Sequence, residues 1–359
     1  YNQNIFNDDI FNSEQNMDND KFIKYVSNEL VNEKDIEIES VLNGVPYKIM
    51  FLVIDSDNGI NIPSILAIPL SNEVNNQIVV EANNLESEDS KKILEQGIQT
   101  GYRLACLTCD LPAPIIIPLI PSHKNYPYLQ QLSIECFDIP KGDKNYRIDE
   151  QVVRIINKSK VILKNEVGLT ASDKIFLNGY SSSGVFAQRF ALLHPDVVET
   201  ACIGGASGSI PVPTKDLSYP LGIADYEQLT GKKFDFENYS KIKFRYYVGE
   251  LETQNKSNTR VDDFGNLAPM HDMSYFNRSV PVDVGKKQRE IFGKDMFSRA
   301  ERTIQVLKSL GIDIQHEIIL GRGHNNIDGI GVNELGDKII SDTYKNTIAD
   351  RELEDNISR

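Results

Sequence analysis

Hydrophobic and polar residues follow two different patterns along this chain, one typical of antiparallel strands and one of alternating strands and helices. Residues 36–41, 47–54 and 64–70 are rich in β-branched and aromatic residues, and Asn-Gly and Asp-Asn-Gly sequences bound them. Apolar residues that alternate with polar ones between such turn signals are typical of strands joined by tight turns. The N-terminal part of the chain is therefore predicted to form antiparallel strands.

From about residue 76 onward, the pattern predicts a central strand and then alternating strands and helices. The run 76–84 has an apolar centre, IVV followed by Glu and Ala, as in a strand buried on both faces. Apolar residues at spacings of three and four predict helices over 87–101, 149–167, 184–195, 298–311 and 334–348. Further strands are predicted over 103–112, 173–179, 198–207, 241–250 and 314–321, and prolines cut the stretch 111–121 into a loop. Such alternation implies an α/β fold with a mostly parallel central sheet and helices on both faces.

The polar segments of the chain indicate how it is organised. Residues 1–34 are rich in Asn and Asp and predict a weakly ordered N-terminal extension. Residues 35–359 are predicted to form one domain, with lid-like insertions at about 205–240 and 254–290. Long loops at the carboxyl end of a parallel sheet often shape a substrate pocket.

Charge and composition exclude several classes of partner. The 359 residues include 52 acidic and 38 basic ones, for a formal net charge of -14, which would repel nucleic acid and anionic lipid. Prolines also interrupt the longest apolar run, so no membrane span is predicted. The chain begins at Tyr1 rather than Met, which is compatible with a removed leader and favours a secreted or cell-envelope location over the cytoplasm.

The four cysteines are too few for a disulfide scaffold in a chain of this length. Cys106 and Cys109 have the spacing of a redox or zinc pair, but they lie in an apolar run and have no second pair. They are predicted to be small, buried core residues.

The stretch LNGYSSSGVF leads from a predicted strand directly into a predicted helix through three consecutive serines. This is the setting of a nucleophile elbow, G-x-S-x-G, in which small residues on either side let the strand and the helix approach. With Ser182 as the nucleophile, one flank would be Tyr180, which is too bulky. With Ser181 the flanks are Gly179 and Ser183, so Ser181 is the predicted nucleophile. Serines also commonly cap helices. The prediction of a nucleophile therefore depends on whether the chain also offers the acid and the histidine of a catalytic triad.

In this motif's fold an acid and then a histidine follow the serine along the chain. His123 precedes the serine, and His194 ends the elbow helix. His316 lies within a predicted strand, and no strand precedes His271. His324 follows the last predicted strand in GRGHNN, where two glycines supply a flexible turn that can bring the ring over the serine.

Two carboxylates follow the predicted strand that ends in Gly249. The Gly-x-x-acid spacing lets Glu252 fold back toward the histidine, so Glu252 is favoured as the acid of the triad. Glu250 stays open as the alternative.

The segments GYSSSG with its helix FAQRFALLHPD, VGELE and GRGHNN resemble the α/β-hydrolase superfamily and, within it, the esterase and depolymerase-like serine hydrolases. The resemblance covers about residues 35–345 and implies the α/β-hydrolase fold. The chain departs from the usual pattern at two positions. Ser183 replaces the second Gly of the pentapeptide, and Glu252 stands where Asp is more usual.

The resemblance also implies an oxyanion hole made of two backbone N–H groups and no metal ion or organic cofactor. The first N–H would come from Ser182, and the second from Asn84 or Leu85, where the run 76–84 ends and the next loop begins. Such a site hydrolyses esters through an acyl-enzyme formed on Ser181.

The polar character of the two insertions favours short-chain, polar or aromatic esters, either small molecules or polymers. A peptidase or an acyltransferase of the same fold is an alternative function. A non-catalytic binding protein of this fold is another. The sequence makes no prediction of the oligomeric state.

Overall fold

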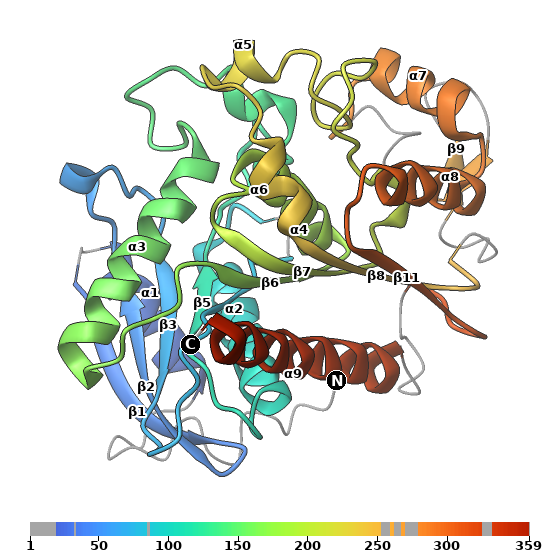
Figure 1. Ribbon diagram of the computed structural model, residues 1–359. Helices are drawn as coiled ribbons and strands as arrows, with labels where there is room; N and C mark the ends of the chain where they lie inside the picture. Colours follow the sequence, from blue (N-terminus) through green and yellow to red (C-terminus); the bar gives the residue numbers. More distant parts are fainter. Residues whose placement is uncertain are drawn as a thin grey trace.

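The computed structural model describes residues 19–31, 34–84, 87–252, 259–261, 267–269, 279–324 and 332–358 (Figure 1). A nine-stranded sheet crosses the molecule. Its strands lie in the order β1 (Ile36–Leu42), β2 (Val45–Leu52), β3 (Ser64–Pro69), β5 (Ile115–Pro118), β4 (Val79–Val80), β6 (Ile175–Tyr180), β7 (Val198–Gly204), β8 (Lys243–Gly249) and β11 (Ile314–Ile319). The first three strands pair antiparallel, and all the pairings from β5 to β11 are parallel. The predicted sheet, with its antiparallel N-terminal strands, is confirmed.

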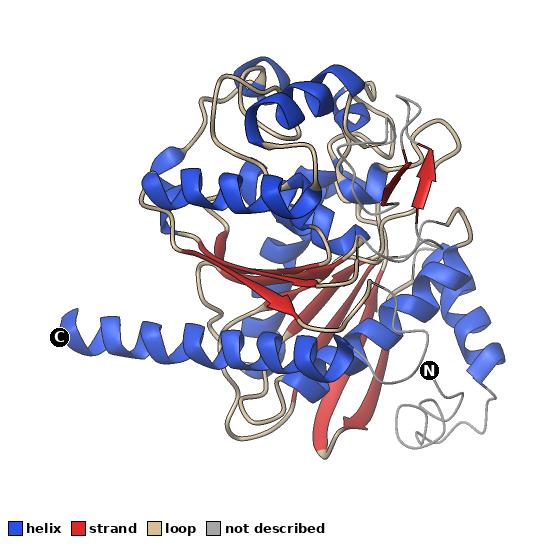
Figure 2. Cartoon of the chain, turned by 90° about the vertical axis from the view of Figure 1, so that its right-hand side faces the viewer, coloured by secondary structure: helices blue, strands red, loops and turns tan. Residues whose placement is uncertain are grey.

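Helices cover both faces of this sheet, as predicted. One face carries α3 (Ile148–Val167), α4 (Ser182–Leu193), α6 (Phe236–Lys241) and α8 (Met296–Ser309), and the other carries α1 (Asn19–Val31), α2 (Ser90–Leu107) and α9 (Val332–Ser358) (Figure 1). Figure 2 shows the long C-terminal helix crossing beneath the strands. The helices α5 (Tyr226–Thr230) and α7 (Val282–Phe292) and the short pair β9 (Thr259–Val261) and β10 (Leu267–Pro269) complete the described elements. Each face buries its own hydrophobic cluster.

The order of the strands places a switch point next to β6. The chain runs from β4 outward to β5 and then returns to β6 on the other side of β4. Val79 and Val80 of β4 pair with Phe176 and Leu177 of β6. In open α/β sheets, ligands bind at the carboxyl ends of the strands at such a reversal. The ends of β4 and β6 are therefore where a site is expected.

The segment 103–121 differs from its prediction. The predicted strand 103–112 begins as the last turn of α2, which runs to Leu107 because the buried side chains Ile98, Leu104 and Ala105 keep helical spacing. The predicted proline-rich loop contains β5, whose three isoleucines are fully buried and pair with neighbours on both sides. Its proline stands at the strand end, where a missing N–H costs little.

Cys106 and Cys109 consequently lie at the end of α2 rather than in a strand. Both are free thiols and only partly buried, so the prediction of two buried core residues is wrong. Cys136 and Cys202 are the buried thiols of the described part of the chain.

Helix α1 lies within the segment 1–34 that was expected to be weakly ordered. Ile23, Val26 and Leu30 recur at spacings of three and four and are buried against α2 and the β1–β2 hairpin. The polar residues between them hide this periodicity in the average composition. Residues 1–18 lie outside the described residues.

The two predicted insertions are described to different extents. Segment 205–240 contains α5 and α6, and Ile210, Leu217, Tyr219 and Leu221 are buried in the cluster that also contains α3 and α4. Much of this insertion is therefore part of the core of that face. Most of segment 254–290 lies outside the described residues. Among the described helices, none is long and apolar enough to span a membrane.

Candidate active site

The turn between β6 and α4 is a sharp one, and Ser181 is at its tip. Ser181 has a φ of 58° and a ψ of −116°, a left-handed conformation that residues other than glycine seldom adopt. A Cβ on Gly179 would lie 2.2 Å from the carbonyl oxygen of Ser183, and a Cβ on Gly184 would lie 2.7 Å from that of Gly204. Glycine is therefore required at both places for the strand and the helix to approach.

A strained serine on a strand–turn–helix junction, at the carboxyl edge of a mostly parallel sheet and beside its switch point, is the combination that defines a nucleophile elbow. The chain has the α/β-hydrolase fold. Of the three serines in this turn, Ser181 has the positive φ, whereas Ser182 and Ser183 already belong to helix α4 of this hydrolase fold.

We expect Gly179→Ala to destabilise this α/β-hydrolase fold. The added Cβ meets backbone, which cannot move without opening the turn, so the free energy of unfolding should fall by about 1–3 kcal/mol or more. Gly101→Ala in α2 is the matched control, because its nearest neighbour is Ile117 Cγ1 at 3.9 Å. Removing a glycine from a helix interior should stabilise by about 0.5–1 kcal/mol. Urea unfolding of both variants measures the difference, and equal effects would contradict the steric argument.

Three side chains meet at the carboxyl edge of the sheet. His324 Nε2 lies 2.8 Å from Ser181 Oγ, and His324 Nδ1 lies 3.0 Å from Glu252 Oε2. The His324 and Glu252 side chains are each 2% exposed, whereas Ser181 is half-buried. In the tautomer with the proton on Nδ1, the ring donates to the Glu252 carboxylate and leaves Nε2 to accept the hydroxyl proton of Ser181. The structure thus brings together the serine, acid and histidine that were predicted from the sequence.

Glu252 and Glu250 have different surroundings. Glu252 Oε1 accepts the N–H of Gly249 at 3.0 Å, which folds the carboxylate back over the end of β8. Glu250 Oε2 accepts the N–H of Gly321 at 2.8 Å at the surface. The structure therefore places Glu252, and not Glu250, against the His324 ring.

The side chain of Ser183 explains its departure from the usual glycine. Its buried Oγ accepts the N–H of Tyr180 at 2.9 Å and lies 3.0 Å from the Tyr180 carbonyl oxygen. Its own N–H donates to Asn84 Oδ1 at 2.9 Å. The Ser183 hydroxyl thus bonds to the main chain on the strand side of the elbow, and the Ser183 N–H connects the elbow to the loop that follows β4.

A buried ion pair that the sequence reasoning missed lies beneath the elbow. The Glu81 carboxylate, on a residue 3% exposed, accepts two bonds of 2.9 Å from Arg103 and one of 2.6 Å from Asn178. Its Oε1 is 3.4 Å from Ser183 Oγ. The signal in the sequence was one acidic residue in the apolar run 76–84, since a buried charge requires a partner.

Ser182, Asn84 and Leu85 are the residues predicted to form an oxyanion hole, and two of them lie in the described part of the chain. The Ser182 side chain accepts a bond of 2.8 Å from Gln131 Nε2, which fixes the first residue of α4. First-turn N–H groups of a helix have no acceptor within the helix. The N–H of Asn84 is already donated to Gln96 Oε1 at 2.7 Å, so in this arrangement it is not offered to an oxyanion. Leu85 lies outside the described residues.

The other described histidines have partners outside this cluster. His194 Nε2 is 2.8 Å from Asp149 Oδ2 at the far end of α4, about 18 Å along the helix from Ser181. His316 Nε2 is 3.0 Å from Ser207 Oγ, and burial lowers the pKa of His316 to about 4. His123 stacks on Tyr126, and His271 lies outside the described residues.

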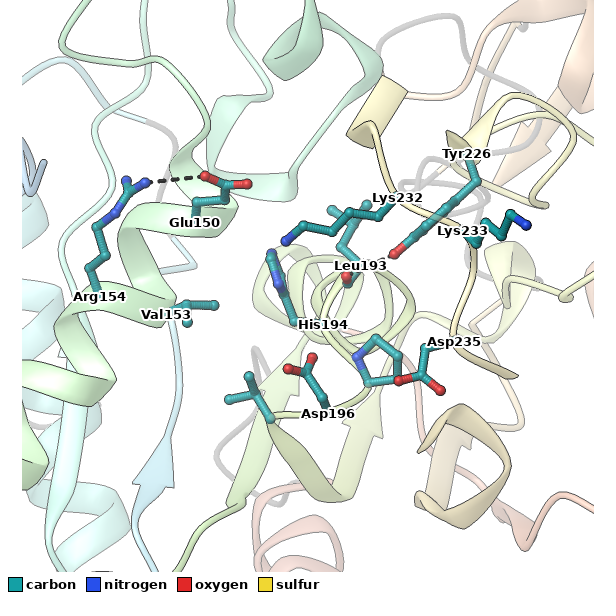
Figure 3. Close-up of a pocket in the computed structure, with 12 residues that line it drawn as sticks. Glu150, Val153, Arg154, Leu193, His194, Asp196, Tyr226, Lys232, Lys233 and Asp235 are labelled. Atoms are coloured by element: carbon teal, nitrogen blue, oxygen red, sulfur yellow. Dashed lines mark hydrogen bonds and ion pairs between the residues drawn. The ribbon is translucent and has the colours of Figure 1, made fainter. Parts of the chain in front are cut away.

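A cavity of about 410 Å³ opens beside His194 (Figure 3). Figure 3 shows the Glu150–Arg154 ion pair of α3 on one side of it and Tyr226 and Lys232 on the other. Because this cavity lies at the opposite end of α4 from Ser181, it is separate from the candidate active site.

No protein-family model and no curated protein matches the chain. Among solved structures, it is similar to LpqC, a poly(3-hydroxybutyrate) depolymerase from Bordetella parapertussis, with 13% identity, a TM-score of 0.47 and coverage of 89% of this chain and 90% of that one. It is also similar to poly(aspartic acid) hydrolase-1 from Sphingomonas sp. KT-1, with 14% identity, a TM-score of 0.46 and coverage of 85% and 98%.

Proposed function

We propose that this protein is a serine hydrolase that cleaves carboxylic esters through an acyl-enzyme, with Ser181, His324 and Glu252 as its catalytic triad. The observation that carries the proposal is the position of His324, whose two ring nitrogens lie 2.8 Å from Ser181 Oγ and 3.0 Å from Glu252 Oε2. These are the distances at which a base takes a proton from a nucleophile while an acid holds its tautomer.

The first half of the proposed reaction makes the acyl-enzyme. Ser181 Oγ attacks the carbonyl carbon of the ester as His324 Nε2 takes the hydroxyl proton, and Glu252 stabilises the imidazolium. The tetrahedral intermediate collapses when the C–O bond to the alcohol breaks and the imidazolium returns the proton to the leaving oxygen. The strained turn presents Ser181 Oγ on the side of His324.

The second half releases the acid. A water molecule gives its proton to His324 Nε2 and attacks the acyl carbon, and Ser181 leaves with that proton. In both halves the oxyanion needs two N–H donors. Ser182 supplies the first in this proposal, and the Gln131 bond to its side chain holds that end of α4 in place. The Asn84 N–H is donated to Gln96, so Leu85 is the proposed second donor.

The proposal extends to the class of substrate. Short acyl chains and polar or aromatic acids, on small or polymeric esters, are the proposed substrates, because the two segments predicted as insertions are polar in sequence. Ile210, Leu217 and Leu221 of segment 205–240 are buried in the core, whereas Lys215, Asp216 and Phe236 are exposed. A long acyl chain needs a broad apolar wall, and Phe236 is the one large apolar side chain of this segment that is exposed.

A serine-directed fluorophosphonate probe and a graded ester panel test the proposed function together. The probe should label the wild-type protein, and short-chain esters should be hydrolysed faster than long-chain ones. A rate that climbs steadily with acyl length, by on the order of 0.8 kcal/mol of transition-state binding per methylene, would contradict the substrate class. Absence of labelling would favour a non-catalytic binding protein, and rapid cleavage of peptide amides or transfer to added alcohols would favour a peptidase or an acyltransferase.

A further inference from the structure

Tyr180, the residue directly before Ser181, contacts His324 in two ways. The two rings stack with centroids 5.2 Å apart and an interplanar angle of 28°. The Tyr180 hydroxyl donates to the main-chain carbonyl oxygen of His324 at 2.7 Å. One side chain therefore touches both the imidazole and the backbone that carries it.

The Tyr180 ring also packs against a second aromatic ring. It stacks on Tyr247 of β8, with centroids 6.0 Å apart. A Cβ on Gly204 would lie 2.2 Å from Tyr247 Cζ and 2.6 Å from Tyr180 Cδ2. A Cβ on Gly205 would lie 2.8 Å from His324 Cε1. The three rings thus lie against bare backbone at the end of β7.

The segment that carries His324 is held to the end of β8 at two points, where the Gly321 N–H donates to Glu250 Oε2 at 2.8 Å and the Arg322 carbonyl accepts the N–H of Leu251 at 2.7 Å. It leaves β11 through Gly321, whose φ is 68°, and through Gly323, where an added Cβ would meet nothing within 4 Å. Two glycines within four residues give the backbone wide conformational freedom. The ring and hydroxyl of Tyr180 add contacts to the imidazole and to the main chain of His324, two residues beyond the last of these bonds and after both glycines.

We propose that Tyr180 is a positioning residue for the catalytic histidine, a role that rests on the proposed function. The hydroxyl fixes the main chain of His324, and the ring face sets the plane in which the imidazole meets both Ser181 and Glu252. During the reaction the imidazole becomes a cation, and a cation within about 6 Å of an aromatic ring is attracted to its face. Burial raises the pKa of the Tyr180 hydroxyl above its ordinary value, which keeps it a neutral donor.

Two variants separate the hydroxyl from the ring. Tyr180→Phe keeps the stacked ring and loses the bond of 2.7 Å, so kcat should fall about five- to tenfold, the usual worth of one hydrogen bond. Tyr180→Leu loses both contacts, and kcat should fall about 30- to 100-fold. KM should stay nearly unchanged in both variants, because Tyr180 acts through His324. Titration with the fluorophosphonate probe counts competent sites, so that kcat refers to folded protein alone.

Tyr226→Phe is the matched control. Tyr226 also donates its hydroxyl to a main-chain carbonyl, that of Leu193 at 3.0 Å, at the opposite end of α4. This variant should keep the wild-type kcat. A loss in Tyr226→Phe as large as that in Tyr180→Phe, or a wild-type kcat in both Tyr180 variants, would overturn the positioning role.

A measurement without substrate tests the stack directly. The chain has five histidines, so the Hε1 resonance of His324 can be assigned by its loss in His324→Gln. The stacked tyrosine shields this proton, and the resonance should move downfield in Tyr180→Leu but not in Tyr180→Phe. An unmoved resonance in Tyr180→Leu would overturn the proposal. Because this result needs no ester hydrolysis, it is distinct from a failure of the proposed function, which absence of probe labelling would reveal.

Discussion

Ser181→Ala should abolish ester hydrolysis, with a fall in kcat on the order of 10⁶-fold. The variant removes the atom that forms the acyl bond and leaves His324 without its proton donor, so none of the covalent route remains. The added strain is small, because alanine replaces serine in the same backbone conformation. Initial rates with a short-chain chromogenic ester and labelling by the fluorophosphonate probe measure the loss.

Ser182→Ala and Ser183→Ala are the matched comparisons for Ser181→Ala, because all three serines lie in one turn. Ser182→Ala keeps the backbone N–H and loses the bond from Gln131, so it should retain part of the activity. Ser183→Ala loses the hydroxyl that accepts the N–H of Tyr180, so its cost should fall mainly on stability. Loss of labelling in Ser182→Ala with labelling kept in Ser181→Ala would move the nucleophile by one residue.

Glu252→Gln should lower kcat by about 10⁴-fold with little change in fold. The amide has nearly the shape of the carboxylate, but it carries no charge to stabilise the imidazolium and can present an N–H toward His324 Nδ1. That N–H would favour the tautomer in which Nε2 carries the proton and cannot accept another from Ser181. Steady-state kinetics and a melting temperature separate this loss from unfolding.

Glu250→Gln is the control for Glu252→Gln, since it makes the same chemical change two residues away. Glu250 accepts a bond from Gly321 at the surface and makes no contact with the His324 ring in the described part of the chain. Its kcat should remain within a few-fold of the wild-type value. The reverse ranking of the two variants would exchange the roles of the two acids.

Much of the fold could be predicted because the spacing of apolar residues within a segment indicates whether it forms a strand or a helix. The helix 149–167 and the strand 173–179 appear within a residue or two of their predicted bounds, since their apolar spacing is regular. Segment 103–121 was predicted wrongly for a physical reason. The three isoleucines favour a strand, whereas the prolines on either side of them favour a loop. Pairing with both β3 and β4 makes this segment a strand.

The candidate site could be predicted in part, because the order of serine, acid and histidine reflects the order of the strands. The bulk of Tyr180 and the small size of Gly179 both favour Ser181 over Ser182 as the predicted nucleophile. In the structure, the positive φ lies at Ser181. The contacts that support the site could not be predicted. Ser183 bonds to Asn84 across 99 residues of sequence, and Tyr180 bonds to His324 across 144, so only the folded sheet brings these partners together.

The place of β11 in the sheet has a consequence for how long the candidate site stays assembled. Among the described strands, β11 pairs with β8 alone, and the segment that carries His324 leaves from its end. Proteins open locally as well as globally, and elements with few buried contacts and exposed backbone hydrogen bonds open most readily. Separation of β11 from β8 would draw His324 away from Ser181 while the other ladders of the sheet stayed paired. We therefore expect the proposed triad to come apart by local opening of this edge more often than by global unfolding of the chain.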